Sequence, residues 1–161
     1  MSASLFSTLA FSSDCPDLSG HYQMDLTSCS GKGYKDSKGW PLPTKISSVV
    51  EVNQKNCEEI QISYLDPAYT SPVKQTVKID IHKARKVVVD DENGLYLNFF
   101  EPKERVTYFG HTLSASETSK IYFRQSNDEL IIKSSILTRG FYDYIIPVLD
   151  NDQFECHLKK I

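Results

Sequence analysis

The stretch VKQTVKIDI, residues 73–81, largely alternates apolar and polar side chains. Successive side chains of a β-strand point to opposite faces, so this pattern predicts a strand with one apolar face and one face in water. The same two-residue period recurs along most of the chain, for example in residues 18–26, 95–99 and 154–158. It is typical of antiparallel sheets, which commonly bury one face and leave the other wet.

Short polar segments separate the predicted strands. Asn93-Gly94 is the clearest turn signal, because both residues tolerate the positive φ angles of a tight hairpin. Residues 126–128 and 150–152 are predicted turns as well. We predict an all-β fold in which a single antiparallel meander closes into a lipocalin-like barrel of about 8–10 strands. A β-sandwich is the alternative.

Composition limits the class of protein. The chain has 161 residues, of which 40% are hydrophobic and 24% charged, and its formal net charge is −3. This length corresponds to one domain with its own core, and the composition excludes wholesale disorder. The negative net charge argues against nucleic acid as a partner. The chain contains no apolar run of about 18 residues, so no integral membrane segment is expected.

The N-terminal residues have a different character. Residues 1–13, MSASLFSTLAFSS, contain no charged side chain. Ala10 and Ser12 have the spacing that a signal peptidase recognises. We interpret this segment as a signal-peptide remnant, with a disordered tail or a short docked helix as alternatives. Residues 14–161 then form the β-barrel domain of a secreted or periplasmic protein.

The number of cysteines is consistent with an exported protein. Cys15, Cys29, Cys57 and Cys156 make an even number, which in a small exported protein indicates two disulfides. Their spacing is not that of a zinc site. In a closed meander whose first and last strands pair antiparallel, Cys29 lies near Cys156, and Cys15 lies near Cys57. An odd strand count or a sandwich would remove this argument.

Two short motifs resemble those of the lipocalin and calycin family. Gly20-His21-Tyr22, on the first predicted strand, is similar to the lipocalin Gly-x-Trp motif, with tyrosine in place of tryptophan. Tyr142-Asp143-Tyr144 is similar to the Thr-Asp-Tyr motif before the penultimate barrel strand. Lipocalins also carry an arginine on the last barrel strand, where this chain has Lys159 and Lys160. The resemblance implies a barrel with a small-ligand site.

Aromatic side chains supply the candidate ligand site. The chain contains nine Tyr, eight Phe and one Trp, and small-ligand sites are commonly lined by such rings with a few polar groups. In the alternative, the same rings simply fill the barrel. The candidate ligand-binding residues are Tyr22, Trp40, Tyr64, Phe99, Tyr108, Phe123 and Asp143.

Two of these candidates have a particular rationale. Trp40 lies in a long loop, residues 27–44, which is expected to be a rim or lid. Its alternative role is to pack on the end of the sheet. Asp143 is an acid within an aromatic segment, so it needs a partner if it is buried, and Arg124 and Arg139 are the candidates.

No catalytic motif appears in the sequence. Nucleophile elbow, phosphate loop and His-Glu-x-x-His patterns are absent, and we identify no catalytic residue, cofactor or metal site. We expect an exported binding barrel for a small, largely apolar ligand. The first alternative is an interaction module whose loops bind a protein or glycan, such as an inhibitor or an envelope adaptor. The second is an enzyme of unknown reaction.

Overall fold

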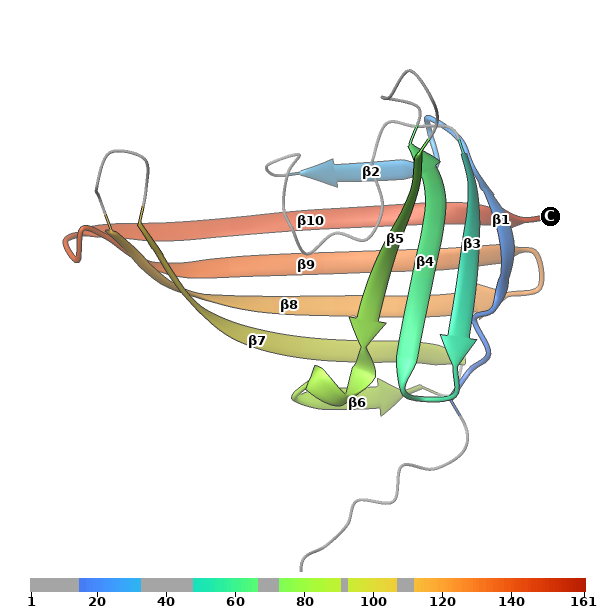
Figure 1. Ribbon diagram of the computed structural model, residues 1–161, viewed down its shortest axis with the longest axis horizontal. Coiled ribbons are helices and arrows are strands. Elements are labelled where there is room, and N and C mark those ends of the chain that lie inside the picture. Colours follow the sequence, from blue (N-terminus) through green and yellow to red (C-terminus); the bar gives the residue numbers. More distant parts are fainter. Residues whose placement is uncertain (1–14, 33–47, 67–72, 91–92, 107–111) are drawn as a thin grey trace, which may run out of the picture.

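A computed structural model describes residues 15–32, 48–66, 73–90, 93–106 and 112–161, with side chains described up to Pro102 in β7 and from Ser114 in β8 (Figure 1). Residues 1–13, interpreted above as a signal-peptide remnant, lie outside this part. The described elements are β1 (Gly20–Met24), β2 (Cys29–Lys32), β3 (Ser48–Lys55), β4 (Glu59–Asp66), β5 (Val73–Asp80), the short 3-10 helix η1 (Ile81–Lys83), β6 (Lys86–Val89), β7 (Gly94–Val106), β8 (Thr112–Ser126), β9 (Glu129–Tyr142) and β10 (Ile146–Lys160).

All ten strands belong to one antiparallel sheet. Its order is β5-β4-β3-β1-β10-β9-β8-β7-β6, and β2 pairs with β10. The first and last strands are therefore neighbours, as expected for a meander whose two ends meet. The all-β antiparallel prediction is confirmed. The sheet curls into an open half-barrel, because β5 and β6 form the two ends of the strand order (Figure 1).

The expected closure of the barrel fails where the chain passes through η1. Ile81 is 1% exposed, and its backbone N–H donates to the carbonyl of Glu58 at 2.9 Å. The Asp80 carboxylate accepts from the backbone N–H of His82 at 3.0 Å and caps η1. These contacts hold η1 beside the β3–β4 turn. The chain therefore enters η1 from β5 and continues into β6 in a different direction (Figure 1). In the described part of the chain, β5 and β6 do not pair with each other.

Strands β7–β10 are much longer than the others. They have 13 to 15 residues each, whereas β3, β4 and β5 have eight, so the long strands extend well beyond the short ones (Figure 1). The predicted turn at residues 126–128 is confirmed, but the one at 150–152 is wrong. Asp150, Asn151 and Asp152 lie inside β10, paired with β9. A continuous ladder from Ile146 to Lys159 overrides their local turn preference.

The core lies between the two curled halves of the sheet. Tyr22 and Phe123 are completely buried in it. The Tyr22 hydroxyl donates to the Leu18 carbonyl at 3.0 Å, which satisfies its one polar atom, and burial raises the pKa of this phenol. The apolar members on β3, β4, β7, β8, β9 and β10 include Val50, Val52, Ile60, Ile62, Leu95, Leu97, Ile121, Leu130, Ile132 and Leu158.

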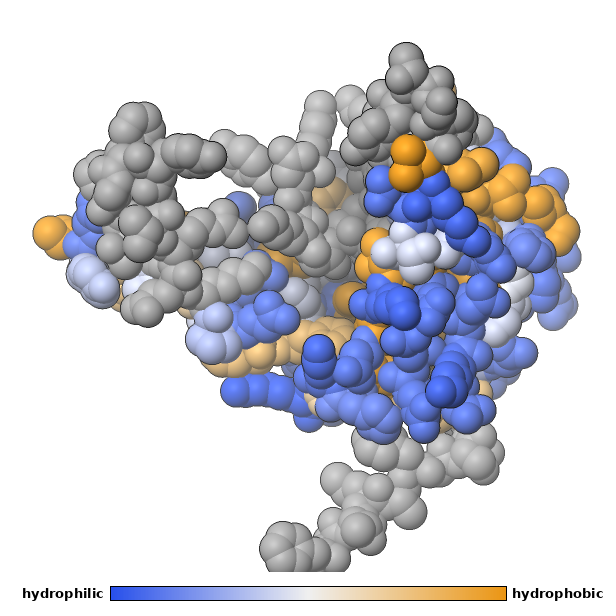
Figure 2. Space-filling model, in the orientation of Figure 1, coloured by the Kyte–Doolittle hydropathy of each residue, from blue (hydrophilic) through white to orange (hydrophobic). Residues whose placement is uncertain are grey.

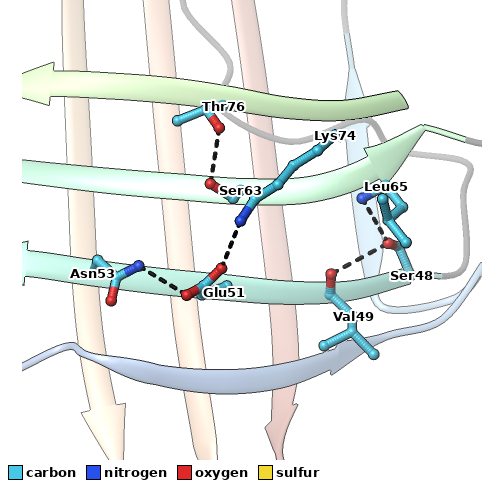
Figure 3. Close-up of polar contacts among 8 residues, drawn as sticks. All are labelled: Ser48, Val49, Glu51, Asn53, Ser63, Leu65, Lys74 and Thr76. Carbon is cyan, nitrogen blue, oxygen red and sulfur yellow. Dashed lines mark hydrogen bonds and ion pairs between the residues drawn. The ribbon is translucent and has the colours of Figure 1, made fainter. Parts of the chain in front are cut away.

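The outer face of β3–β5 is polar, as the alternation predicts. Figure 2 shows a mostly hydrophilic surface over these strands. Lys74 and Asn53 donate to the Glu51 carboxylate at 2.9 Å and 3.1 Å, and Ser63 and Thr76 share a 2.9 Å hydrogen bond (Figure 3). The hydrogen bond from Lys74 is the largest cause that lowers the pKa of Glu51. The Lys74–Glu51 contact ties β5 to β3 across β4.

Two disulfides form, Cys15–Cys57 and Cys29–Cys156, in the pairing that the meander argument predicts. Cys29 lies directly opposite Cys156 in the β2–β10 ladder. Disulfides persist mainly in oxidising compartments, and the two bonds indicate such a compartment for this protein. Among the described residues, no helix has the length and apolar character needed to cross a membrane.

Candidate functional site

The open side of the half-barrel forms a cleft between β5 and the inner face of β7 and β8. We call it the open-edge cleft. Its volume is about 380 Å³, within the range of small-molecule sites. Its lining residues are Val77, Lys78, Ile79 and Asp80 of β5, Lys83 of η1, Phe99 and Glu101 of β7, and Glu117, Ser119 and Ile121 of β8.

Strand alternation explains which side chains reach the cleft. On β7, Leu95 and Leu97 face the core, and Phe99 and Glu101 follow at the next positions of the same face. Phe99 packs against the core and is partly exposed. The inner face of the long strands therefore changes from apolar to acidic as it leaves the core.

The cleft combines an apolar floor with charged side chains of both signs, because Lys78 and Lys83 line it as well as Asp80, Glu101 and Glu117. Val77, Ile79, Phe99 and Ile121 supply the apolar surface. Glu101 lies directly opposite Glu117 in the β7–β8 ladder. The Ser119 hydroxyl donates to Glu117 at 3.4 Å. Two carboxylates in one cross-strand pair favour a cationic or hydrogen-bond-donating group nearby.

The candidate ligand residues from the sequence fall in different places. Of the five whose side chains are described, only Phe99 lines the open-edge cleft. Tyr22 and Phe123 are core residues, and Tyr64 packs partly buried against the core. Asp143 lies in the β9–β10 turn. Trp40 and Tyr108 lie outside the described residues. A ligand-binding role for these residues stays a prediction.

Sequence reasoning missed most of the cleft. Glu101 shares the alternating face of Leu95, Leu97 and Phe99, so the period of two alone places it beside Phe99. Its pairing with Glu117 depends on the β7–β8 register, and no short motif specifies that register. The approach of β5 to these strands depends on the open edge, which the sequence analysis did not predict.

No protein-family model matches the chain, and no curated protein or solved structure matches it either. The curled antiparallel sheet is compatible with a barrel fold, and a relationship to lipocalins stays a prediction. In the described part of the chain, His, Cys, Asp and Glu side chains form no group of three or more that could hold a metal ion.

A second, larger groove lies on the outer face of β7–β10 and has a volume of about 520 Å³. Tyr96, Tyr122, Lys133 and Glu155 form one row across the four strands. Lys133 pairs with Glu155 at 3.1 Å, and the Tyr122 hydroxyl donates to Asp90 at 2.9 Å. The open-edge cleft differs from this groove because Val77, Ile79, Phe99 and Ile121 place its floor at the margin of the buried core, and we take it as the candidate ligand site.

His157 lies beside this groove, between two carboxylates. Its Nε2 is 2.7 Å from Glu155, and its Nδ1 is 3.0 Å from Glu129. The hydrogen bond with Glu155 is the largest cause that raises the pKa of His157, and burial opposes it. Because the folded-state pKa is raised, the stabilisation is complete below the unfolded pKa and is lost as pH rises through the folded pKa. The groups are partly exposed, so its size is below about 1 kcal/mol.

We therefore expect Glu155→Gln to lower the pKa of His157, measured by NMR titration of the imidazole protons. The matched control is Glu58→Gln, which removes an exposed carboxylate that pairs with Lys55 instead. An unchanged His157 titration in Glu155→Gln would contradict the assigned cause.

Proposed function

We propose that this chain is an exported binding protein that holds a small, largely apolar ligand in the open-edge cleft. The observation that carries the proposal is the cleft itself, an opening at the margin of the core with an apolar floor of Val77, Ile79, Phe99 and Ile121 beside charged side chains. The two disulfides support export. A lipocalin-like ancestry is consistent with the curled meander and with Gly20-His21-Tyr22 on β1, whereas Tyr142-Asp143-Tyr144 precedes the last strand, β10, and not the penultimate one.

The lining of the cleft suggests the chemistry of the ligand. Its apolar part lies against Phe99, Val77 and Ile121, and its polar end faces Glu101 and Glu117. Lys78, Asp80 and Lys83 line the β5 side of the cleft, whereas the β7–β8 side carries the paired carboxylates of Glu101 and Glu117. A ligand whose polar end faces this pair suits it better as a protonated amine than as a fatty acid, because like charges repel. The ligand class that we propose is therefore an apolar molecule with an amine or another hydrogen-bond donor at one end.

Calorimetric titration with alkylamines, the matching alcohols and the matching fatty acids tests this proposal. Phe99→Ala is expected to weaken amine binding about tenfold or more, because it removes a large part of the apolar floor. Phe100→Ala is the matched control. Phe100 is the next residue on the strand, and its ring lies on the opposite face, 4.1 Å from the guanidinium carbon of Arg85.

A second variant tests the contact of the ligand's polar end with the carboxylates. Glu117→Gln should weaken binding of the amines and leave binding of the alcohols unchanged, because it removes charge and keeps shape. Absence of binding heat for every probe would overturn the proposal, as would an equal loss of affinity in Phe99→Ala and Phe100→Ala. The loop-based alternative rests on residues 27–44, most of which lie outside the described residues.

A further inference from the structure

The end of the β9–β10 hairpin exposes a cluster of large apolar side chains. The exposed fractions are 51% for Phe141, 67% for Tyr144, 80% for Ile145, 58% for Ile146 and 72% for Leu149. We call these five residues the apolar tip. Contiguous exposed apolar side chains mark interaction sites more often than isolated ones do.

The fold places the apolar tip far from the body of the protein. It lies at the end of the long strands, beyond β3–β5 and opposite the C-terminus (Figure 1). Figure 2 shows hydrophobic atoms at this end of the molecule. The turn gives Asp143 and Tyr144 positive φ angles of 49° and 62°. A tyrosine rarely adopts this backbone region, so the chain accepts an unfavourable conformation where it presents Tyr144.

The apolar side chains of the tip stand on both faces of the hairpin. Phe141 pairs with Pro147 and Leu149 pairs with Arg139, whereas Ile146 pairs with Tyr142 on the opposite face. Tyr144 and Ile145 occupy the turn between them. A rigid protein docked on the sheet would cover one face alone. Apolar groups on both faces and at the end indicate a fluid apolar medium that surrounds the hairpin end, and a lipid bilayer is such a medium.

The charges of the hairpin end indicate which kind of bilayer it suits. Residues 139–150 contain one basic side chain, Arg139, and two acidic ones, Asp143 and Asp150. Anionic headgroups are recognised by clusters of lysine and arginine, which this segment lacks. Transfer of apolar surface is then the driving force, and tyrosine is a residue type that concentrates at membrane interfaces.

We propose that the apolar tip inserts into the interface of a phospholipid bilayer and attaches the protein peripherally to a membrane. No residue of the open-edge cleft belongs to the apolar tip, so this inference does not depend on the proposed ligand site. Ligand binding and membrane attachment can consequently fail separately.

Co-sedimentation with vesicles of neutral phosphatidylcholine tests the proposal. The double variant Ile145→Ser/Ile146→Ser is expected to partition at least about tenfold more weakly than the wild type, because each isoleucine contributes apolar transfer energy. The matched control is Leu26→Ser/Ile161→Ser. Both control residues are 65% exposed, and neither belongs to the β9–β10 hairpin. The control should bind as the wild type does, and circular dichroism should show that both variants are folded.

A second measurement reports insertion directly. Tyr144→Trp in a Trp40→Phe background should show blue-shifted emission with vesicles and quenching by brominated lipid, whereas Leu26→Trp in that background should show neither. Absence of vesicle binding by the wild type would overturn the proposal, and so would binding to anionic vesicles alone. Dimerisation that Ile145→Ser/Ile146→Ser abolishes, with no vesicle binding, would assign the apolar tip to a second copy of the chain instead.

Discussion

Removal of the Cys29–Cys156 disulfide is expected to lower the free energy of unfolding by about 4–5 kcal/mol. The bond joins residues 127 apart, and the chain entropy that a disulfide removes from the unfolded state grows with the size of the closed loop. Because small domains are stable by about 5–15 kcal/mol, the loss is a large part of the total. The measurement is guanidinium denaturation of the double variant Cys29→Ala/Cys156→Ala in oxidising buffer.

The other disulfide gives the matched control. Cys15–Cys57 closes a shorter loop, with a separation of 42, and continues the register of the β1–β3 ladder. Its removal should cost about 1 kcal/mol less by the same entropy relation. Cys156 is also completely buried, so its replacement removes core contacts as well. An equal loss in the two double variants would contradict this order.

The position of Cys29–Cys156 in the sheet is a further reason for a large effect. The two halves of the sheet meet where β10 lies beside β1 and β2. The β1–β10 ladder has only two residue pairs, and the β2–β10 ladder has four. By contrast, fourteen pairs join β9 to β10. The disulfide is therefore the covalent connection at the junction with the fewest residue pairs between the two halves.

The two-residue period made most of the fold predictable. It gives the strands and their buried faces, and the antiparallel pairing of the first and last strands leads to the correct disulfides. The open edge was not predictable in this way, because it depends on how η1 and Ile81 pack against the β3–β4 turn. The turn at Asp143 and Tyr144 was also missed. Turn preferences favoured residues 150–152, and only the long β9–β10 register excludes them.

The candidate site was less predictable than the fold, for a physical reason. An inward aromatic side chain that fills a core and one that lines a cleft have the same alternation in the sequence. Phe99 and Phe123 both face inward, but Phe123 lies among core residues, while Phe99 lies where the inner face reaches the cleft. The contribution of Glu117 depends on cross-strand register with Glu101, which local pattern does not encode.

Replacement of Phe123 by alanine is expected to lower the free energy of unfolding by about 3–5 kcal/mol, measured by denaturant titration. Phe123 is completely buried, and it lies between Leu95 of β7 and Ile132 of β9 in the sheet register. The lost contacts and the cavity that remains both contribute to this cost. Phe99→Ala should cost much less, because Phe99 is already partly exposed.

The milder variant Phe123→Leu distinguishes a role of Phe123 in the core from a role in ligand binding, even if Phe123→Ala is too unstable to study. It keeps most of the buried volume, so it should fold, lose about 1–2 kcal/mol and bind alkylamines as the wild type does. Phe99→Ala should show the opposite pattern, a small loss of stability and a large loss of affinity. If Phe123→Leu weakened binding as much as Phe99→Ala did, the ligand would enter the core itself. The site would then include Phe123 and its buried neighbours, as the lipocalin resemblance implies, and the open-edge cleft would be its entrance.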